Sequence, residues 1–167
     1  MQPSYKNQCG TVTAEINGVV SADVKCSHEM EVDDWTNILQ LTSSNLRGNP
    51  GQRFFALFRN KDNQQLQLSV DDPSTDILWA VSDWFDCVPG EWQTWQFERT
   101  QNSDNPIMTD LSVSLDGVTV FSNSVPTANV YADDDLDVYL SNRWNIAGSA
   151  YAVRNFYYQT FTKIKAV

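Results

Sequence analysis

Acidic side chains gather in three short stretches of the sequence where they could bind a cation. Asp133, Asp134 and Asp135 are consecutive, and smaller acidic groups lie within residues 71–76 and 83–86. Calcium takes about six to eight oxygen ligands, often loop carboxylates and backbone carbonyls. We expect a calcium site at Asp133, Asp134 and Asp135 before the other two stretches, and the alternative is a solvated acidic turn.

Tryptophans near predicted loops could contact a sugar, because an aromatic ring offers an apolar face while amides and charged groups bind hydroxyls. Trp79 and Trp84 lie beside and within the irregular stretch 82–91, and Trp144 lies in the sequence NRWN. The alternative is that these rings pack within their loops. The residues predicted to contact a ligand are Trp79, Trp84, Asn142, Arg143 and Trp144.

The elements that must position these loops are predicted to be β-strands. No window of eleven or more residues has the apolar spacing of a helix, whereas alternation of apolar and polar residues is common. Trp35, Trp92 and Trp95 fall on such runs, so we expect at least two of them in the core. We count about ten to twelve short strands separated by turn residues, which is typical of a sandwich or barrel. Strands are expected near residues 11–16, 19–24, 38–41, 54–58, 65–70, 77–81, 92–97, 111–115, 118–121, 136–140 and 153–161.

Two dipeptides predict tight hairpin turns. Asp116-Gly117 separates the alternating runs 111–115 and 118–121, and Asn17-Gly18 separates 11–16 from 19–24. Such pairs favour type I′ turns, because both central residues need a positive φ. We therefore expect hairpins at both places, within one domain that spans residues 1–167.

Charge and hydropathy exclude several classes of partner. The formal net charge is −10, which disfavours nucleic acid and anionic membranes. No apolar run approaches the roughly 20 residues that a membrane-spanning helix needs. We therefore expect neither nucleic-acid binding nor membrane insertion, and the acidic surface also serves solubility.

The three cysteines leave their pairing open. Cys9, Cys26 and Cys87 are an odd number, so at least one is unpaired or joins another chain, and a disulfide-linked pair of chains is possible. None has the C-x-x-C spacing of a zinc site. The N-terminal residues lack the basic and apolar regions of a signal peptide, which fits either a cytosolic protein or a mature secreted one.

The segments between residues 10 and 162 resemble a known superfamily. They are DWTNILQLT with GQRFFALF (34–42, 51–58), GEW with the D-G hairpin (90–92, 110–117), and DLDVYLSNRW with AG and VRNF (135–144, 147–148, 153–156). This order resembles the concanavalin A-like lectin/glucanase superfamily, and within it small laminin-G-like jelly-roll domains. The resemblance implies an all-β, two-sheet antiparallel jelly-roll sandwich, an extracellular location, calcium in loops, and a final VRNF strand that packs back on the first.

No catalytic arrangement accompanies this resemblance. The glucanase branch uses an E-x-D-x-x-E strand, and none of the five glutamates lies in that pattern. His28 is the only histidine, and no G-x-S-x-G elbow occurs. A lyase-like set of His28, Tyr139 and Arg154 can be imagined, but nothing in the sequence brings these residues together.

The sequence therefore predicts a non-catalytic extracellular binding module that binds carbohydrate, with calcium as its expected cofactor. The alternative is an extracellular structural or protein-interaction domain, so the expected partner is a glycan or an extracellular protein. A glycan-cleaving enzyme is the third hypothesis.

Overall fold

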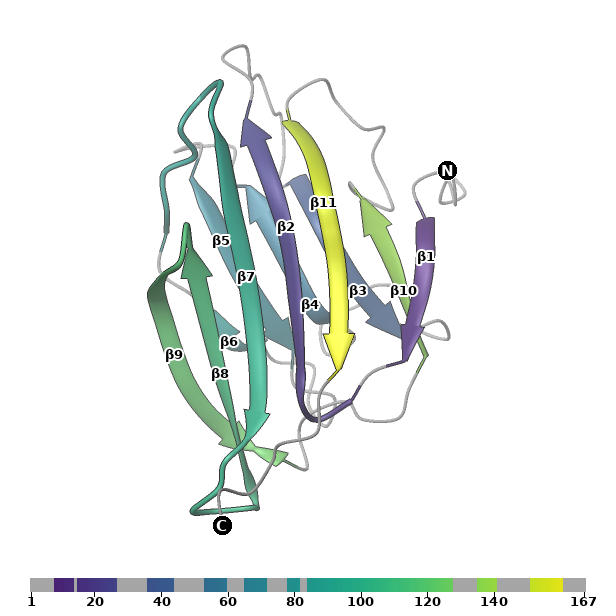
Figure 1. The fold of residues 1–167 in the computed structure, drawn as a ribbon, viewed down its shortest axis with the longest axis vertical. Coiled ribbons are helices and arrows are strands. Elements are labelled where there is room, and N and C mark those ends of the chain that lie inside the picture. Colours follow the sequence, from purple (N-terminus) through teal and green to yellow (C-terminus); the bar gives the residue numbers. More distant parts are fainter. Residues whose placement is uncertain are drawn as a thin grey trace.

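The fold consists of two antiparallel sheets stacked face to face, as Figure 1 shows. The computed structural model describes residues 8–13, 15–26, 36–43, 53–59, 65–71, 78–81, 84–127, 135–140 and 151–160. These residues form eleven strands and no α-helix. The six-stranded sheet has the order β1 (Gln8–Thr13), β10 (Asp135–Leu140), β3 (Thr36–Ser43), β4 (Arg53–Arg59), β5 (Leu66–Asp71) and β6 (Leu78–Val81). The five-stranded sheet has the order β11 (Tyr151–Thr160), β2 (Gly18–Cys26), β7 (Trp92–Gln101), β8 (Met108–Leu115) and β9 (Val118–Pro126).

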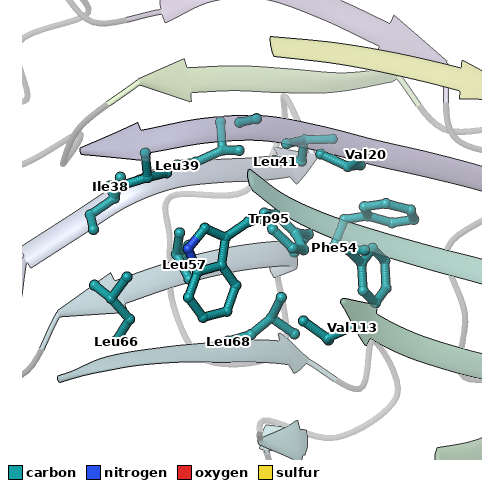
Figure 2. Close-up of a cluster of buried hydrophobic side chains, with 14 of the residues drawn as sticks. Val20, Ile38, Leu39, Leu41, Phe54, Leu57, Leu66, Leu68, Trp95 and Val113 are labelled. Carbon is teal, nitrogen blue, oxygen red and sulfur yellow. The ribbon is translucent and has the colours of Figure 1, made fainter. Parts of the chain in front are cut away.

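Alternating apolar residues fill the space between the sheets. Trp95, on β7, is 2% exposed and lies among Leu57, Leu66 and Leu68 from the opposite sheet (Figure 2). Full burial of one such side chain stabilises the folded state by about 1.5–3 kcal/mol. Trp95 is thus one core tryptophan of the at least two expected among Trp35, Trp92 and Trp95. Trp92 lies half-buried on the face of β7 that points away from the core, and Trp35 lies outside the described residues.

One charged residue of β7 also faces the interior. Arg99 is 1% exposed, and its guanidinium carbon lies 4.0 Å from the ring centroid of Phe54. Burial lowers the pKa of Arg99 to about 9, although Tyr158 and Glu15 act in the opposite direction. Contact with an aromatic face partly compensates a buried cation for lost water, so Arg99 serves packing at this end of the sandwich.

The predicted D-G hairpin is confirmed. Asp116 and Gly117 have φ values of 51° and 80°, and the strands that they join pair directly from Leu115 to Val118. Positive φ at both central residues is the requirement of a type I′ turn, which matches the twist of the flanking strands.

The predicted N-G hairpin is wrong. β1 pairs with β10 in the six-stranded sheet, whereas β2 belongs to the five-stranded sheet, so the chain crosses between sheets before Gly18. Neither Asn17 nor Gly18 has a positive φ. The Asn17 side chain instead accepts a hydrogen bond from the backbone N–H of Gln101 at 2.8 Å. Gly18 allows close packing, because a Cβ there would lie 3.1 Å from the Tyr158 hydroxyl oxygen.

The expected pairing of the final strand needs a similar correction. β11 pairs with β2 and not with β1, since β1 lies in the other sheet (Figure 1). The ladder is interrupted by a bulge between Arg154 and Tyr157, where Asn155 has a φ of 51°. A bulge bends its strand and redirects side chains.

Candidate functional site

The predicted ligand contacts fall partly within the described structure. Trp84 is half-buried in the segment that follows β6, and Trp79 lies on β6, at the edge of the six-stranded sheet. Asn142, Arg143 and Trp144 lie outside the described residues. Trp84 is therefore the predicted residue around which a site can be built.

The segment around Trp84 continues the sheet beyond β6. Phe85 exchanges two backbone hydrogen bonds with Leu66 of β5, at 2.7 and 2.9 Å. The Phe85 ring points into the core, where its centroid lies 5.5 Å from that of Trp95. Successive side chains of an extended chain point to opposite faces. Trp84 and Asp86 are therefore placed on the outer face of the six-stranded sheet, away from the core.

Cross-strand hydrogen bonds fix Asp86. Gln65 precedes Leu66, and its amide nitrogen donates to Oδ1 of Asp86 at 2.9 Å. From the core side, the buried amide of Gln93 accepts a hydrogen bond from the N–H of Val88 at 3.0 Å and donates a long one to the carbonyl of Asp86 at 3.4 Å. The segment is thus held from both sides.

A disulfide bond ties the same segment to the opposite sheet. Cys87 is bonded to Cys26 at the end of β2, with a Cα–Cα distance of 6.1 Å. The N–H of Gly90 donates to the carbonyl of Cys26 at 2.8 Å. Gly90 has a φ of 82° after Pro89, as a type II turn requires. Sequence reasoning left the cysteine pairing open, and the third cysteine, Cys9, lies on β1.

A row of buried residues runs across the outer side of the six-stranded sheet, starting beside this segment. Register places Tyr139, Gln40, Ala56 and Ser69 in one row over β10, β3, β4 and β5. All four are buried although they face away from the core. The Ser69 hydroxyl is buried without a hydrogen-bond partner among the described residues. Gln67 is half-buried and lies two positions before Ser69 on β5. The Leu66–Phe85 pairing places it beside Trp84.

This edge of the outer face combines three kinds of group. Trp84 supplies an aromatic surface, the exposed Asp86 supplies carboxylate acceptors, and Gln65 and Gln67 supply amides. Such a set suits a neutral polyhydroxylated ligand, because hydroxyls can donate to the carboxylate and exchange hydrogen bonds with amides. We call Trp84, Asp86, Gln65 and Gln67 the amide face.

A second cluster lies on the outer face of the five-stranded sheet. Asp23 of β2 accepts hydrogen bonds from the Thr94 hydroxyl at 2.7 Å, from Asn155 Nδ2 at 2.7 Å and from Arg154 Nε at 3.2 Å. The guanidinium carbon of Arg154 lies 4.0 Å from the centroid of the Trp92 ring. The Thr94 hydrogen bond, with those of Asn155 and Arg154, lowers the pKa of Asp23 despite partial desolvation.

Sequence reasoning missed this cluster as a site. Asp23, Trp92 and Arg154 come from three strands that meet only through the order β11-β2-β7. The signal in the sequence is Arg154-Asn155 of the VRNF motif, to which the family resemblance gives a structural role.

Of the three predicted calcium ligands, one lies within the described residues. Asp135 is the exposed first residue of β10 and accepts a hydrogen bond from the Thr13 hydroxyl at 3.1 Å, and Asp133 and Asp134 lie outside the described residues. In the ranges that the structure describes, no three Asp, Glu, His or Cys side chains form a group that could hold a metal ion. Calcium binding therefore stays a prediction.

The imagined lyase constellation does not assemble from its described members. Tyr139 lies on β10 of one sheet and is 1% exposed, whereas Arg154 lies on β11 of the other. His28 lies outside the described residues. A common reaction centre for Tyr139 and Arg154 is excluded by this separation.

Comparisons with known proteins match the fold but not the sequence. No protein-family model matches the chain, and neither does any curated protein. Sheep galectin-11, solved with glycerol, is similar with a TM-score of 0.53 at 12% identity, over 93% of this chain and all of that one. The alginate lyase PA1167 of Pseudomonas aeruginosa gives 0.59 at 13% identity, over 88% of this chain and 66% of that one. The receptor-binding domain of botulinum neurotoxin D gives 0.58 at 15% identity, over 95% of this chain and 37% of that one. The two stacked antiparallel sheets and these neighbours establish that the chain adopts a concanavalin A-like jelly-roll fold.

Proposed function

We propose that the chain is an extracellular lectin-like module that binds a neutral glycan on the amide face without cleaving it. The observation that carries this proposal is the placement of Trp84 and Asp86 on either side of the anchored Phe85, with Gln65 bonded across to Asp86 at 2.9 Å.

Rigidity of this segment favours binding. Backbone pairing with Leu66, the Gln93 amide and the Cys26–Cys87 disulfide all hold residues 84–88 before a ligand arrives. A preorganised site loses less conformational entropy on binding than a mobile one. The second oxygen of Asp86 can accept from a sugar hydroxyl, and its negative charge disfavours acidic sugars.

Two further observations support the extracellular assignment and the choice of ligand. A disulfide bond persists chiefly in oxidising compartments, which fits a secreted protein. The fold is shared with a galectin and with a toxin receptor-binding domain, both of which are binding proteins by name.

In the part of the chain that the structure describes, no helix has the length and hydropathy to span a membrane.

Titration with neutral oligosaccharides tests the proposal. We expect at least one glucose-, galactose- or mannose-based oligosaccharide to bind in calorimetry, and Trp84→Ala to weaken it about tenfold or more. Asp86→Asn should weaken it less, since one hydrogen-bond acceptor remains. Ile107→Ala, which truncates an apolar side chain 71% exposed elsewhere, should bind like the wild type.

Three outcomes would count against the proposal. A flat response to the whole panel favours the protein-interaction alternative, and full affinity in Trp84→Ala removes the amide face from the site. Release of shorter or unsaturated products from the bound sugar would make the chain an enzyme.

Calcium assistance is a separate part of this proposal, carried by Asp133, Asp134 and Asp135. We expect EDTA to lower the melting temperature and calcium to restore it, because a ligand that binds only the folded state stabilises it. An unchanged melting curve would remove calcium from the account.

A further inference from the structure

The two cations that lie against Trp92 distinguish the outer face of the five-stranded sheet from the amide face. Lys25 of β2 is paired in register with Trp92 of β7, and its Nζ lies 5.8 Å from the ring centroid. Arg154 approaches from β11, on the other side of β2, to 4.0 Å. The chain has 11 Lys and Arg residues against 21 Asp and Glu, and two of these cations meet at one ring, where Asp23 pairs with one of them.

Two contacts orient the guanidinium of Arg154 but leave part of its hydrogen-bonding capacity for a ligand. Its Nε donates to Asp23 at 3.2 Å and its plane lies over Trp92, while the side chain remains 51% exposed. Within the described residues, the terminal Nη groups have no hydrogen bond. A guanidinium held in this way presents two parallel N–H donors, the arrangement that binds a carboxylate in bidentate geometry.

The backbone of β11 is distorted where this arrangement is made. Asn155 adopts a φ of 51° at the bulge, which costs a non-glycine residue free energy that surrounding contacts must offset. The distortion lets neighbouring residues Arg154 and Asn155 both bond to Oδ2 of Asp23. In a regular strand, neighbouring side chains would point to opposite faces.

Neutral groups beside the cations provide the remaining surface for a sugar. Tyr157, 47% exposed, follows the bulge on β11, and its register row crosses the buried Ser21 to the half-buried Gln96 and Ser114. An exposed ring, hydroxyls and amides are the groups that contact sugar C–H faces and hydroxyls.

From this arrangement we infer a second binding site, centred on Arg154, Lys25 and Trp92, that takes a carboxylate-bearing sugar of an acidic glycan. We call it the cationic face. Asp23 is a positioning residue, because it acts through Arg154. The site lies on the opposite sheet from the amide face and does not depend on the function proposed there.

Calorimetry with hexagalacturonate at low ionic strength tests the inference, with the fully methyl-esterified hexamer as the neutral match. We expect the acid to bind and the ester to bind at least about tenfold more weakly, since charge-assisted hydrogen bonds are lost. Monomeric galacturonate and acetate should both bind more weakly than the hexamer. Equal binding of the ester, or acetate as tight as the hexamer, would overturn the glycan assignment.

Variants test whether the guanidinium of Arg154 binds the carboxylate. Arg154→Gln should abolish binding of the acid, and Arg154→Lys, which keeps the charge without the planar fork, should weaken it about tenfold. Lys163→Gln removes a formal positive charge near the end of the chain and serves as the control for net charge. Wild-type affinity in Arg154→Gln overturns the inference, and so does an equal loss in the Lys163 variant.

A spectroscopic measurement covers the case in which Arg154→Gln fails to fold. The Arg154 Nε–H resonance of the wild-type protein should shift on addition of hexagalacturonate, and Lys25→Gln should weaken binding several-fold. An unmoved resonance at saturating hexagalacturonate would also overturn the inference.

Discussion

The two outer faces of the sandwich differ in the charge of the side chains that lie beside their tryptophans. On the six-stranded sheet, Trp84 lies with a carboxylate that is bonded to one amide. On the five-stranded sheet, Trp92 lies with two cations, and the carboxylate of Asp23 is already bonded to three donors. One face therefore presents acceptors to hydroxyls, and the other presents donors to anions.

The two faces also differ in what holds them. The amide face depends on a segment fixed by a disulfide and by backbone pairing with β5, whereas the cationic face is built on three adjacent strands and a bulge. A perturbation of the segment should therefore affect neutral-sugar binding and leave the cationic face intact.

Removal of the disulfide should have the largest effect. The bond closes a sequence separation of 61 residues, so Cys26→Ala with Cys87→Ala should lower the free energy of unfolding by about 4 kcal/mol on the loop-entropy estimate. Urea unfolding measures this loss. Below the transition, neutral-sugar affinity should fall while hexagalacturonate affinity persists. Loss of both affinities in equal measure would contradict the difference between the faces.

Gln93→Ala should have the next largest effect. The variant removes the Gln93 hydrogen bonds to the N–H of Val88 and to the carbonyl of Asp86, which together should cost about 1–3 kcal/mol of folding free energy at about 0.5–1.5 kcal/mol each. The melting temperature should fall, and the neutral sugar should bind more weakly because residues 86–88 lose their support. Unchanged sugar affinity would mean that the disulfide and Phe85 alone fix the segment.

A turn substitution at a residue of neither face provides the stability control, and the adjacent Asp116 links this turn to Thr94. Gly117 has a φ of 80°, so Gly117→Ala should cost about 1 kcal/mol through backbone strain. Both sugar affinities should stay within about twofold of the wild type, since the folded structure is retained. A change in only one of them would show that stability and binding are coupled at that face.

The acid dependence of Asp23 should be the smallest effect. Its pKa is lowered in the folded state, so its contribution to stability is present above the ordinary value of 3.8 and is lost as the pH falls through the lower folded value. The difference in unfolding free energy between wild type and Asp23→Asn should therefore be greatest near neutral pH and shrink below about pH 4. A difference that grows in acid would have the wrong sign. Asp23→Asn should also weaken hexagalacturonate several-fold by releasing Arg154.

Local sequence signals explain which parts of the fold could be predicted. Asp116-Gly117 specifies its turn because its two strands are consecutive and pair with each other. Asn17-Gly18 has the same local chemistry, yet β1 finds its partner in β10, more than a hundred residues away. Turn chemistry cannot report such a non-local choice.

The same distinction applies to the candidate sites. Trp84 could be predicted because a loop tryptophan is recognisable by itself, but its partner Gln65 comes from a neighbouring strand. The Trp92–Arg154 contact requires β11 to lie beside β2, which follows only from the assembled sheet. No spacing in the sequence relates these two residues.

The central claim is that the two faces bind sugars of opposite character, and indole N–H resonances test it most directly. Each tryptophan contributes one such signal, so titration with a neutral oligosaccharide and with hexagalacturonate reports each ring separately. We expect the neutral sugar to shift Trp84, the acidic sugar to shift Trp92, and neither to shift the buried Trp95. Shifts of the same tryptophans by both sugars, or of none by either, would contradict the account.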